Sequence, residues 1–175
     1  VINNKVFKAH FLVAKCNGLT ACDSKIMQGA GLITSMLLNK LDRKLLSKQY
    51  QRYIFRHPNS KLVINDPYNF SNVYQTLTVD NIKNAVLASG SIPMVMSGVK
   101  DIHGAAKGTY RDGGIIDYHF DFSLGRSSSN KKNVEKYSEN EHSDKRNCGV
   151  KSKGLTLYPH FTSEPKAGWF DKNST

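Results

Sequence analysis

The sequence contains few cysteines, no long hydrophobic run and too few acidic residues to balance its basic ones. Its three cysteines, Cys16, Cys22 and Cys148, are an odd number in 175 residues, and no two have C-x-x-C spacing. We therefore expect neither a disulfide framework nor a structural zinc site, and reduced thiols predict a cytoplasmic protein. No stretch approaches the roughly 20 apolar residues that a membrane-spanning helix needs, and the first residues lack the pattern of a signal peptide.

The balance of charge is strongly basic. The chain has 25 Lys and Arg residues against 14 Asp and Glu residues, so its formal net charge is +11, and 39% of its residues are hydrophobic. This composition is sufficient for one domain with a core, and the charge suits a nucleic acid, an anionic membrane surface or plain solubility. No RNA-binding aromatic motif or helix-turn-helix pattern is present, so a specific nucleic-acid partner is not expected.

The chain divides into three parts by composition. Residues 1–124 contain alternating and periodic apolar positions and are expected to be ordered. Residues 125–153 are polar and charged with little to bury, which predicts a disordered insertion. Residues 154–175 contain a short apolar run and Trp169, which predict a return strand and a C-terminal tail. Because the first residue is Val1 rather than Met, we expect the chain to be a fragment.

Strands and helices are expected to alternate along the ordered part. Short apolar or alternating runs predict strands at residues 6–15, 61–66, 108–114 (with a tight turn at its end) and 115–124. Residues 78–91 predict a helix that begins at an N-cap, Thr78, and ends at Gly90. The alternation predicts an α/β fold in which helices flank a central sheet.

A long helix is expected over residues 28–56. Ile33, Leu37, Leu41 and Leu45 recur at every fourth position and predict a buried apolar stripe. The opposite face is basic, with Lys40, Arg43, Lys44, Lys48, Arg52 and Arg56. A solvated surface helix is the simpler interpretation of residues 40–56, and peripheral contact with an anionic membrane is the alternative.

Two short motifs are candidates for chemistry. Asp112, Gly113 and Gly114 follow an expected strand, and an Asp-Gly pair is typical of a tight turn whose glycine has a positive φ. Such a turn also exposes a carboxylate where α/β sheets place catalytic groups. The second motif contains Ser89, Ser91 and Pro93 at the end of the expected helix, and neither serine has the G-x-S-x-G frame of a nucleophile elbow.

Taken together, the two motifs resemble those of the patatin-like phospholipases. In that family a helix of the form A-x-x-A-S-x-S-I-P precedes a strand that ends in a D-G-G/A motif. Here the helix matches at Ala85, Ala88, Ser89, Ser91, Ile92 and Pro93, and the second motif matches at Asp112, Gly113 and Gly114. The resemblance covers about residues 6–121 and extends to a late strand at residues 154–161.

The resemblance implies a patatin-like sheet and a serine acyl hydrolase that acts on phospholipid or another acyl lipid without a cofactor. Its Ser-Asp dyad would use Asp112 as the proton acceptor, with the glycines keeping bulk away from the nucleophile. The chain has no G-x-S-x-G and no convincing oxyanion loop, and in the family's order both would precede Val1. We therefore expect a patatin-like domain truncated at its N-terminus and inactive as it stands.

Other interpretations remain open. Asp117, His119 and Asp121 alternate along residues 115–124 and could hold a divalent cation, although a solvated strand face is the simpler reading and the resemblance requires no metal. An inactive remnant of an enzyme and a basic module that binds an anionic membrane or nucleic acid are the alternative functions. An in-frame G-x-S-x-G upstream of Val1 would separate an enzyme fragment from a remnant.

Overall fold

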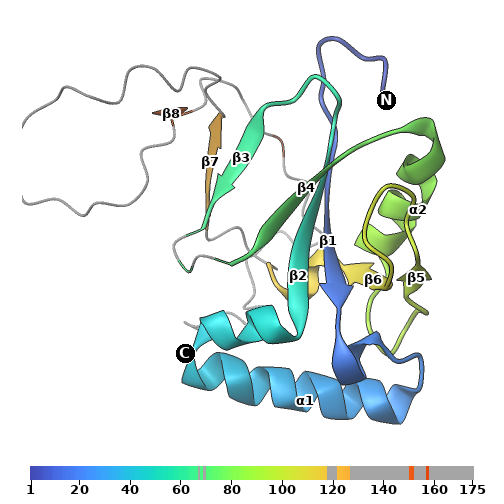
Figure 1. Ribbon diagram of the computed structural model, residues 1–175, viewed down its shortest axis with the longest axis vertical. Helices are drawn as coiled ribbons and strands as arrows, with labels where there is room; N and C mark the ends of the chain where they lie inside the picture. Colours follow the sequence, from blue (N-terminus) through green and yellow to red (C-terminus); the bar gives the residue numbers. More distant parts are fainter. Residues whose placement is uncertain (67, 69, 118–121, 127–149, 152–156, 158–175) are drawn as a thin grey trace, which may run out of the picture.

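The computed structural model describes residues 1–66, 68, 70–117, 122–126, 150–151 and 157, which form two sheets with helices packed around them (Figure 1). The larger sheet has five strands in the order β4-β2-β1-β6-β5. These strands are β1 (His10–Cys16), β2 (Tyr50–Arg56), β4 (Asn72–Thr76), β5 (Val99–Lys100) and β6 (Thr109–Asp112). The smaller sheet, in the order β3-β7-β8, contains β3 (Leu62–Asn65), β7 (Ser123–Arg126) and β8 (Val150–Lys151).

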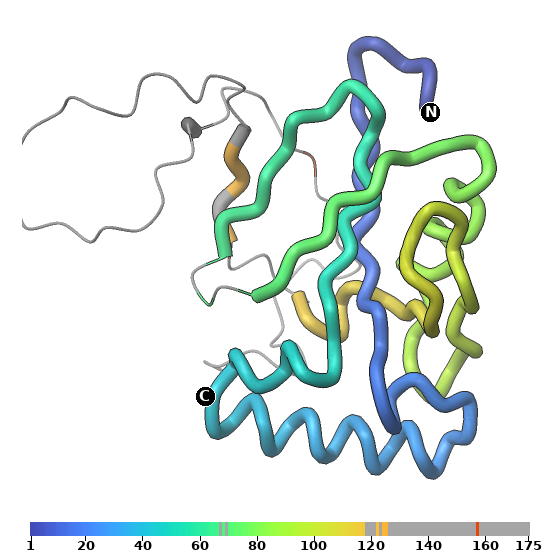
Figure 2. Tube along the Cα trace, viewed as in Figure 1, coloured from blue at the N-terminus to red at the C-terminus, as the bar shows by residue number. Residues whose placement is uncertain are grey.

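The larger sheet is mixed. Strand β1 is antiparallel to both β2 and β6, β5 is antiparallel to β6, and β2 and β4 run parallel. The sequence correctly predicts a mixed α and β architecture with helices against a central sheet, and the pairing shows that most neighbouring strands are antiparallel. The trace in Figure 2 shows the chain after α2 (Val79–Ser89) returning through β5 and β6 at one edge of the sheet.

Different elements pack against the two faces of the larger sheet. Because side chains alternate along a strand, Val13 and Ala14 point to opposite faces. Val13 belongs to a core cluster with Ala85 and Ala88 of α2. On the other face, Ala14 packs in a cluster with Leu32, which lies on α1 (Lys25–Leu41), and farther along the strands a third cluster joins this face to the smaller sheet. The sheet is therefore covered on both sides.

Helix α2 matches the sequence-based expectation in position and capping. Thr78 is its N-cap, and the side chain of Asn81 accepts a hydrogen bond from the Thr78 backbone N–H (2.8 Å) in a capping box. Gly90 is the C-cap. Ala85 and Ala88 are buried and Val86 is exposed, so the buried face of the helix turns toward Asn81.

The prediction of one long helix over residues 28–56 is wrong. Helix α1 ends at Leu41, a 3-10 helix, η2 (Arg43–Lys48), follows, and residues Tyr50–Arg56 form β2, which lies between β4 and β1 in the sheet. The side chain of Asp42 accepts a hydrogen bond from the backbone N–H of Lys44 (2.9 Å) and starts η2 with a new direction. Tyr50, Ile54 and Phe55 are buried in the sheet, so tertiary burial overrides the helical spacing of the apolar residues.

The prediction that the apolar stripe of this helix is buried is also wrong. Ile33, Leu37 and Leu41 are 62%, 61% and 78% exposed, and Leu45, which is not on α1, is half-buried. The face of α1 that turns inward instead carries Gln28, Gly31, Leu32, Ser35 and Asn39. The apolar spacing correctly indicates one face of a helix, but that face is turned toward solvent.

The remaining expectations are tested only in part. Strand β1 begins at His10 rather than at Val6, and β3 and β6 lie where strands are expected. Strand β7 crosses the expected boundary at residue 124, and β8 lies near the end of the expected insertion. The rest of residues 125–153, and residues 154–175 apart from Leu157, lie outside the described residues.

Candidate active site at the end of strand β6

Asp112 is the last residue of β6 and the N-cap of the 3-10 helix η3 (Gly113–Ile115). Its Oδ1 accepts a hydrogen bond from the backbone N–H of Gly114 (2.9 Å). The backbone of Asp112 is therefore held by strand β6, and its carboxylate is held by the N–H of Gly114 in η3. The sequence correctly predicts a strand that ends in a turn at this place.

The surroundings of the Asp112 carboxylate make it a better base than an ordinary aspartate. Burial raises the pKa of Asp112, because desolvation penalises the charged form, and the hydrogen bond from Gly114 only partly offsets this rise. Among the described residues, no group donates a hydrogen bond to Oδ2. One carboxylate oxygen is therefore held in place, and the other is available to a proton donor.

Gly113 is required for space and not for an unusual backbone angle. Neither Gly113 nor Gly114 has a positive φ, so the expected turn type is wrong. A Cβ on Gly113 would lie 2.6 Å from the carbonyl oxygen of Leu12, in the neighbouring strand β1. A Cβ on Gly114 would meet the Asp112 carboxylate at 3.4–3.5 Å, which is ordinary contact. The first glycine therefore allows η3 to pack directly on the β1 backbone.

The two sequence motifs meet in the structure. The backbone N–H of Asp112 donates a hydrogen bond to the carbonyl oxygen of Ser91 (3.1 Å). The hydroxyl of Ser91, just beyond the C-cap of α2, donates to the carbonyl oxygen of Leu87, and the hydroxyl of Ser89 donates to the carbonyl oxygen of Val86. Within the described part of the chain, no serine hydroxyl is hydrogen-bonded to Asp112. These serines therefore shape the segment beside Asp112 without facing its carboxylate.

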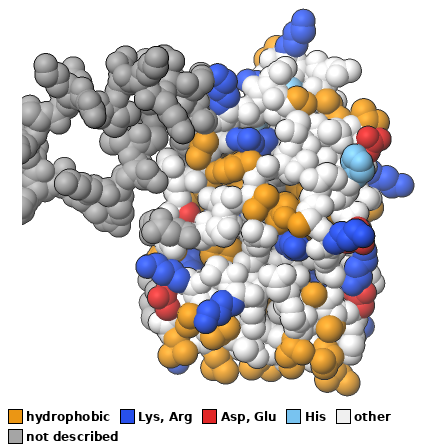
Figure 3. Space-filling model, in the orientation of Figure 1, with side chains coloured by type: hydrophobic (Ala, Val, Ile, Leu, Met, Phe, Trp, Pro, Cys, Tyr) orange, Lys and Arg blue, Asp and Glu red, His pale blue; other side chains and the backbone are white. Residues whose placement is uncertain are grey.

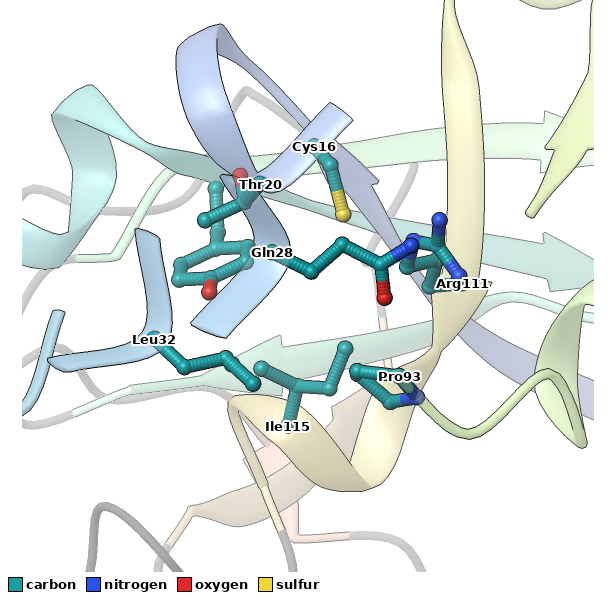
Figure 4. Close-up of a pocket in the computed structure, with 8 residues that line it drawn as sticks. Cys16, Thr20, Gln28, Leu32, Pro93, Arg111 and Ile115 are labelled. Atoms are coloured by element: carbon teal, nitrogen blue, oxygen red, sulfur yellow. The ribbon is translucent and has the colours of Figure 1, made fainter. Parts of the chain in front are cut away.

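Pro93 lies in a small pocket on the α1 side of the molecule. The pocket is lined by Cys16, Thr20, Gln28, Leu32, Tyr50, Pro93, Arg111 and Ile115. The Gln28 side chain extends across it toward Arg111 (Figure 4). The Oε1 atom of Gln28 accepts a hydrogen bond from the backbone N–H of Met94 (2.8 Å), a residue with the unusual φ of 65°. Gln28 thus holds the turn after Pro93 in a left-handed conformation.

Arg111 is an important neighbour that no pattern in the sequence singles out. Its guanidinium is buried and donates to the carbonyl oxygens of Met96 (2.8 Å) and Cys22 (3.2 Å) and to Asp23 (3.1 Å). Because it precedes Asp112 on β6, it points to the opposite face of the sheet. The Arg111 pocket and the Asp112 carboxylate are therefore separate sites. No local signal in the sequence distinguishes Arg111 from the other basic residues.

The sequence favours a solvated strand face for Asp117, and this expectation is wrong. Asp117 is buried just after η3 and pairs with Arg52 and Arg43. Its partners in the candidate cation site, His119 and Asp121, lie outside the described residues. Among the residues that are described, no group of three or more His, Cys, Asp or Glu side chains is arranged to hold a metal ion.

The basic residues expected on one helix face in residues 40–56 do not share a surface. Lys40, Lys44 and Lys48 are exposed, whereas Arg43 and Arg52 are buried. The two arginines lie on different elements, η2 and β2, and both contact the segment that follows η3. They act in the interior and cannot contact a membrane.

Comparisons with known proteins add no assignment. No family model, curated protein or solved structure matches this chain. In the portion of the chain with a described structure, no helix combines the length and hydropathy needed to cross a bilayer.

Proposed function

We propose that the chain is the part of a patatin-like lipid acyl hydrolase that carries the catalytic aspartate, Asp112. The proposed reaction is the hydrolysis of a carboxylic ester of a phospholipid or another acyl lipid through an acyl-serine, without a cofactor. The proposed location is the cytoplasm, in keeping with the free thiols of Cys16 and Cys22. The motifs that contain Ser91 and Asp112 support this proposal, because they match the family in sequence and are hydrogen-bonded to each other.

The observation that carries the proposal is the state of the Asp112 carboxylate. It is half-buried, its pKa is raised by desolvation, and Gly114 holds only one of its oxygens. A general base works best when its pKa approaches the working pH and its geometry is fixed. A surface aspartate at an ordinary turn has neither property, so the environment favours a chemical role over a purely structural one.

In the proposed mechanism, Asp112 is the only protein group that carries the proton. As a serine hydroxyl attacks the ester carbonyl carbon, Asp112 accepts its proton and then gives it to the leaving alkoxide. Water attacks the acyl-serine in the second half, again losing its proton to Asp112, which returns it to the serine. Gly113 lets η3 pack closely on β1, and the Gly114 N–H keeps the carboxylate in one orientation.

The proposed nucleophile is not among these 175 residues. The sequence has no G-x-S-x-G, and the hydroxyls of Ser89 and Ser91 donate to carbonyl oxygens of α2. We therefore propose that the serine and the oxyanion donors belong to a segment that precedes Val1 in the gene. By itself the chain should be inactive.

Labelling with a fluorophosphonate probe, which reacts with activated serines, tests this arrangement. The 175-residue chain should not be labelled, and a chain extended through the upstream reading frame should be labelled once, on the serine of a G-x-S-x-G. Ser89→Ala and Ser91→Ala in the extended chain should leave labelling in place. Labelling of the short chain would place the nucleophile within it, and an upstream frame without the motif would identify a remnant of an enzyme.

A further inference from the structure

Helix α1 presents an apolar face to solvent. Six large hydrophobic side chains of this 17-residue helix are exposed: Ile26, Met27, Ile33, Met36, Leu37 and Leu41. At about 1.5 Å per residue the helix is about 25 Å long. Ile26, Ile33, Leu37 and Leu41 lie on its outer face and form a strip along most of one edge of the molecule, and Met27 and Met36 lie on the two flanks of that face. Hydrophobic side chains gather along the lower edge in Figure 3, where Figure 1 places α1. Single exposed apolar residues are common, but a continuous strip marks a contact surface.

The orientation of α1 is fixed by its polar inner face. The hydroxyl of Ser35 donates to the carbonyl oxygen of Gly31 (2.7 Å) and lies 3.1 Å from the Tyr50 hydroxyl oxygen. Gly31 allows a close approach, since a Cβ there would lie 2.8 Å from the Thr20 side chain. Gln28 is hydrogen-bonded to the Met94 backbone. Turning the helix to bury its apolar strip would break the contacts of Ser35 with Tyr50 and of Gln28 with Met94, and would move Gly31 away from Thr20.

The charges beside the strip are mainly positive. Residues Lys25–Leu41 contain no acidic side chain. Lys25, Lys40, Lys44 and Lys48 are exposed on α1 or on the 3-10 helix that follows it. The two acidic residues that flank α1 are both engaged within the molecule. Asp23 pairs with Arg111 and Lys100, and Asp42 accepts a hydrogen bond from the backbone of Lys44.

We propose that this face of α1, which we call the α1 strip, docks on a bilayer that contains anionic lipids. The helix would lie in the plane of the interface, with Ile26, Ile33, Leu37 and Leu41 about 5–10 Å into the boundary between headgroups and acyl chains and the two methionines at its margins. The four lysines would lie at the level of the anionic headgroups. The combination of an apolar strip, flanking lysines and a helix without acidic residues favours a lipid surface over a second copy of this chain, because two copies would bring mainly like charges together.

Docking of the α1 strip does not require catalysis, so it stands apart from the role of Asp112. The experiment is sedimentation of the 175-residue chain with vesicles of phosphatidylcholine alone or mixed with phosphatidylserine. We expect binding to the mixed vesicles that weakens as salt is raised from about 0.1 M to about 1 M. Asp112→Asn should bind as the unchanged chain does, so failure of the hydrolase proposal leaves this result unaffected.

Substitutions in the strip test the surface itself. Ile33→Ser and Leu37→Ser should each lower the vesicle partition coefficient about tenfold, since each removes one inserted aliphatic side chain. Lys40→Gln and Lys44→Gln should each lower it about fivefold on mixed vesicles only. Because all four side chains are exposed, circular dichroism should show an unchanged fold. The matched controls are Val79→Ser and Leu87→Ser, which remove exposed apolar side chains from α2 and should leave binding unchanged.

Several results would overturn the proposal. One is equal binding to neutral and anionic vesicles, or binding that the α2 controls reduce as much as the strip variants do. Another is an absence of vesicle binding, which would mean that another part of the chain or a second copy covers the strip. If a second copy covers it, light scattering would show a dimer that Leu37→Ser dissociates.

Discussion

The guanidinium of Arg52 donates two hydrogen bonds to the carboxylate of Asp117, from Nε to Oδ2 and from Nη2 to Oδ1, each at 2.5 Å. Both side chains are about 1% exposed. Nη1 of Arg52 also donates to Asp66 (2.6 Å) and Asn72 (2.8 Å). This one side chain therefore joins β2 to the segment after β3, to β4 and to the segment that follows the Asp112 motif.

Asp117→Asn should strongly destabilise the fold, because it removes one charge of a buried ion pair and leaves the Arg52 guanidinium short of an acceptor. The expected loss in the free energy of unfolding is about 3 kcal/mol or more. Urea unfolding followed by circular dichroism measures it, with the exposed Asp80→Asn as the control. A loss below about 1 kcal/mol would show that the pair is solvated in solution.

Arg52 also shows where sequence patterns stop being informative. Its spacing to Lys44 and Lys48 fits the basic face of a helix, and nothing local indicates that it lies on a β-strand. Its role depends on Asp117, 65 residues away in sequence. In contrast, β6 and α2 were predictable because a turn motif, an N-cap and a C-cap are local signals.

Gly113→Ala and Gly114→Ala should differ sharply although they are adjacent. The new Cβ at Gly113 would lie 2.6 Å from the backbone oxygen of Leu12, so strand β1 or η3 must move. We expect a loss of about 2–3 kcal/mol in the free energy of unfolding. Gly114→Ala meets only ordinary contacts and should stay within about 0.5 kcal/mol. Thermal or urea unfolding compares the two, and equal losses would contradict the close packing of η3 on β1.

Asp112→Asn should stabilise the fold near neutral pH. Burial raises the pKa of Asp112, so the folded protein holds this proton more tightly than the unfolded chain does. The ionised carboxylate therefore lowers the free energy of unfolding as pH rises past the ordinary aspartate range. Asparagine keeps an oxygen for the Gly114 N–H and carries no charge. The stability advantage of the variant should be largest near neutral pH and should vanish near about pH 3.

An equal or lower stability of Asp112→Asn near neutral pH would show that the carboxylate is favourably solvated. The same variant gives a direct reading by nuclear magnetic resonance, since the Asp112 resonance that titrates above the ordinary range should be missing. The sequence singles out this residue through its motif, and its role in catalysis stays a prediction. It does not reveal that one oxygen is held and the other open, because that depends on packing against β1 and α2.

Cys16 should resist alkylation in the folded protein. It is 2% exposed, and burial raises the pKa of its thiol to about 12, with only partial opposition from the charge of Arg111. Near pH 8 about one such thiol in ten thousand is ionised. Iodoacetamide followed by peptide mass spectrometry should therefore modify the more accessible Cys22 and leave Cys16 unmodified until denaturant is added. Equal modification in the native state would show that the core around Cys16 opens readily.

The most direct test of the proposed function is ester turnover by a chain extended upstream of Val1 to include a G-x-S-x-G segment. With a p-nitrophenyl acyl ester, Asp112→Asn should lower kcat about 100-fold to 10,000-fold, as expected for loss of a general base. Asp80→Asn, which changes an exposed carboxylate on α2, should leave turnover unchanged. Turnover that persists in Asp112→Asn would contradict the role of this carboxylate as the proton acceptor.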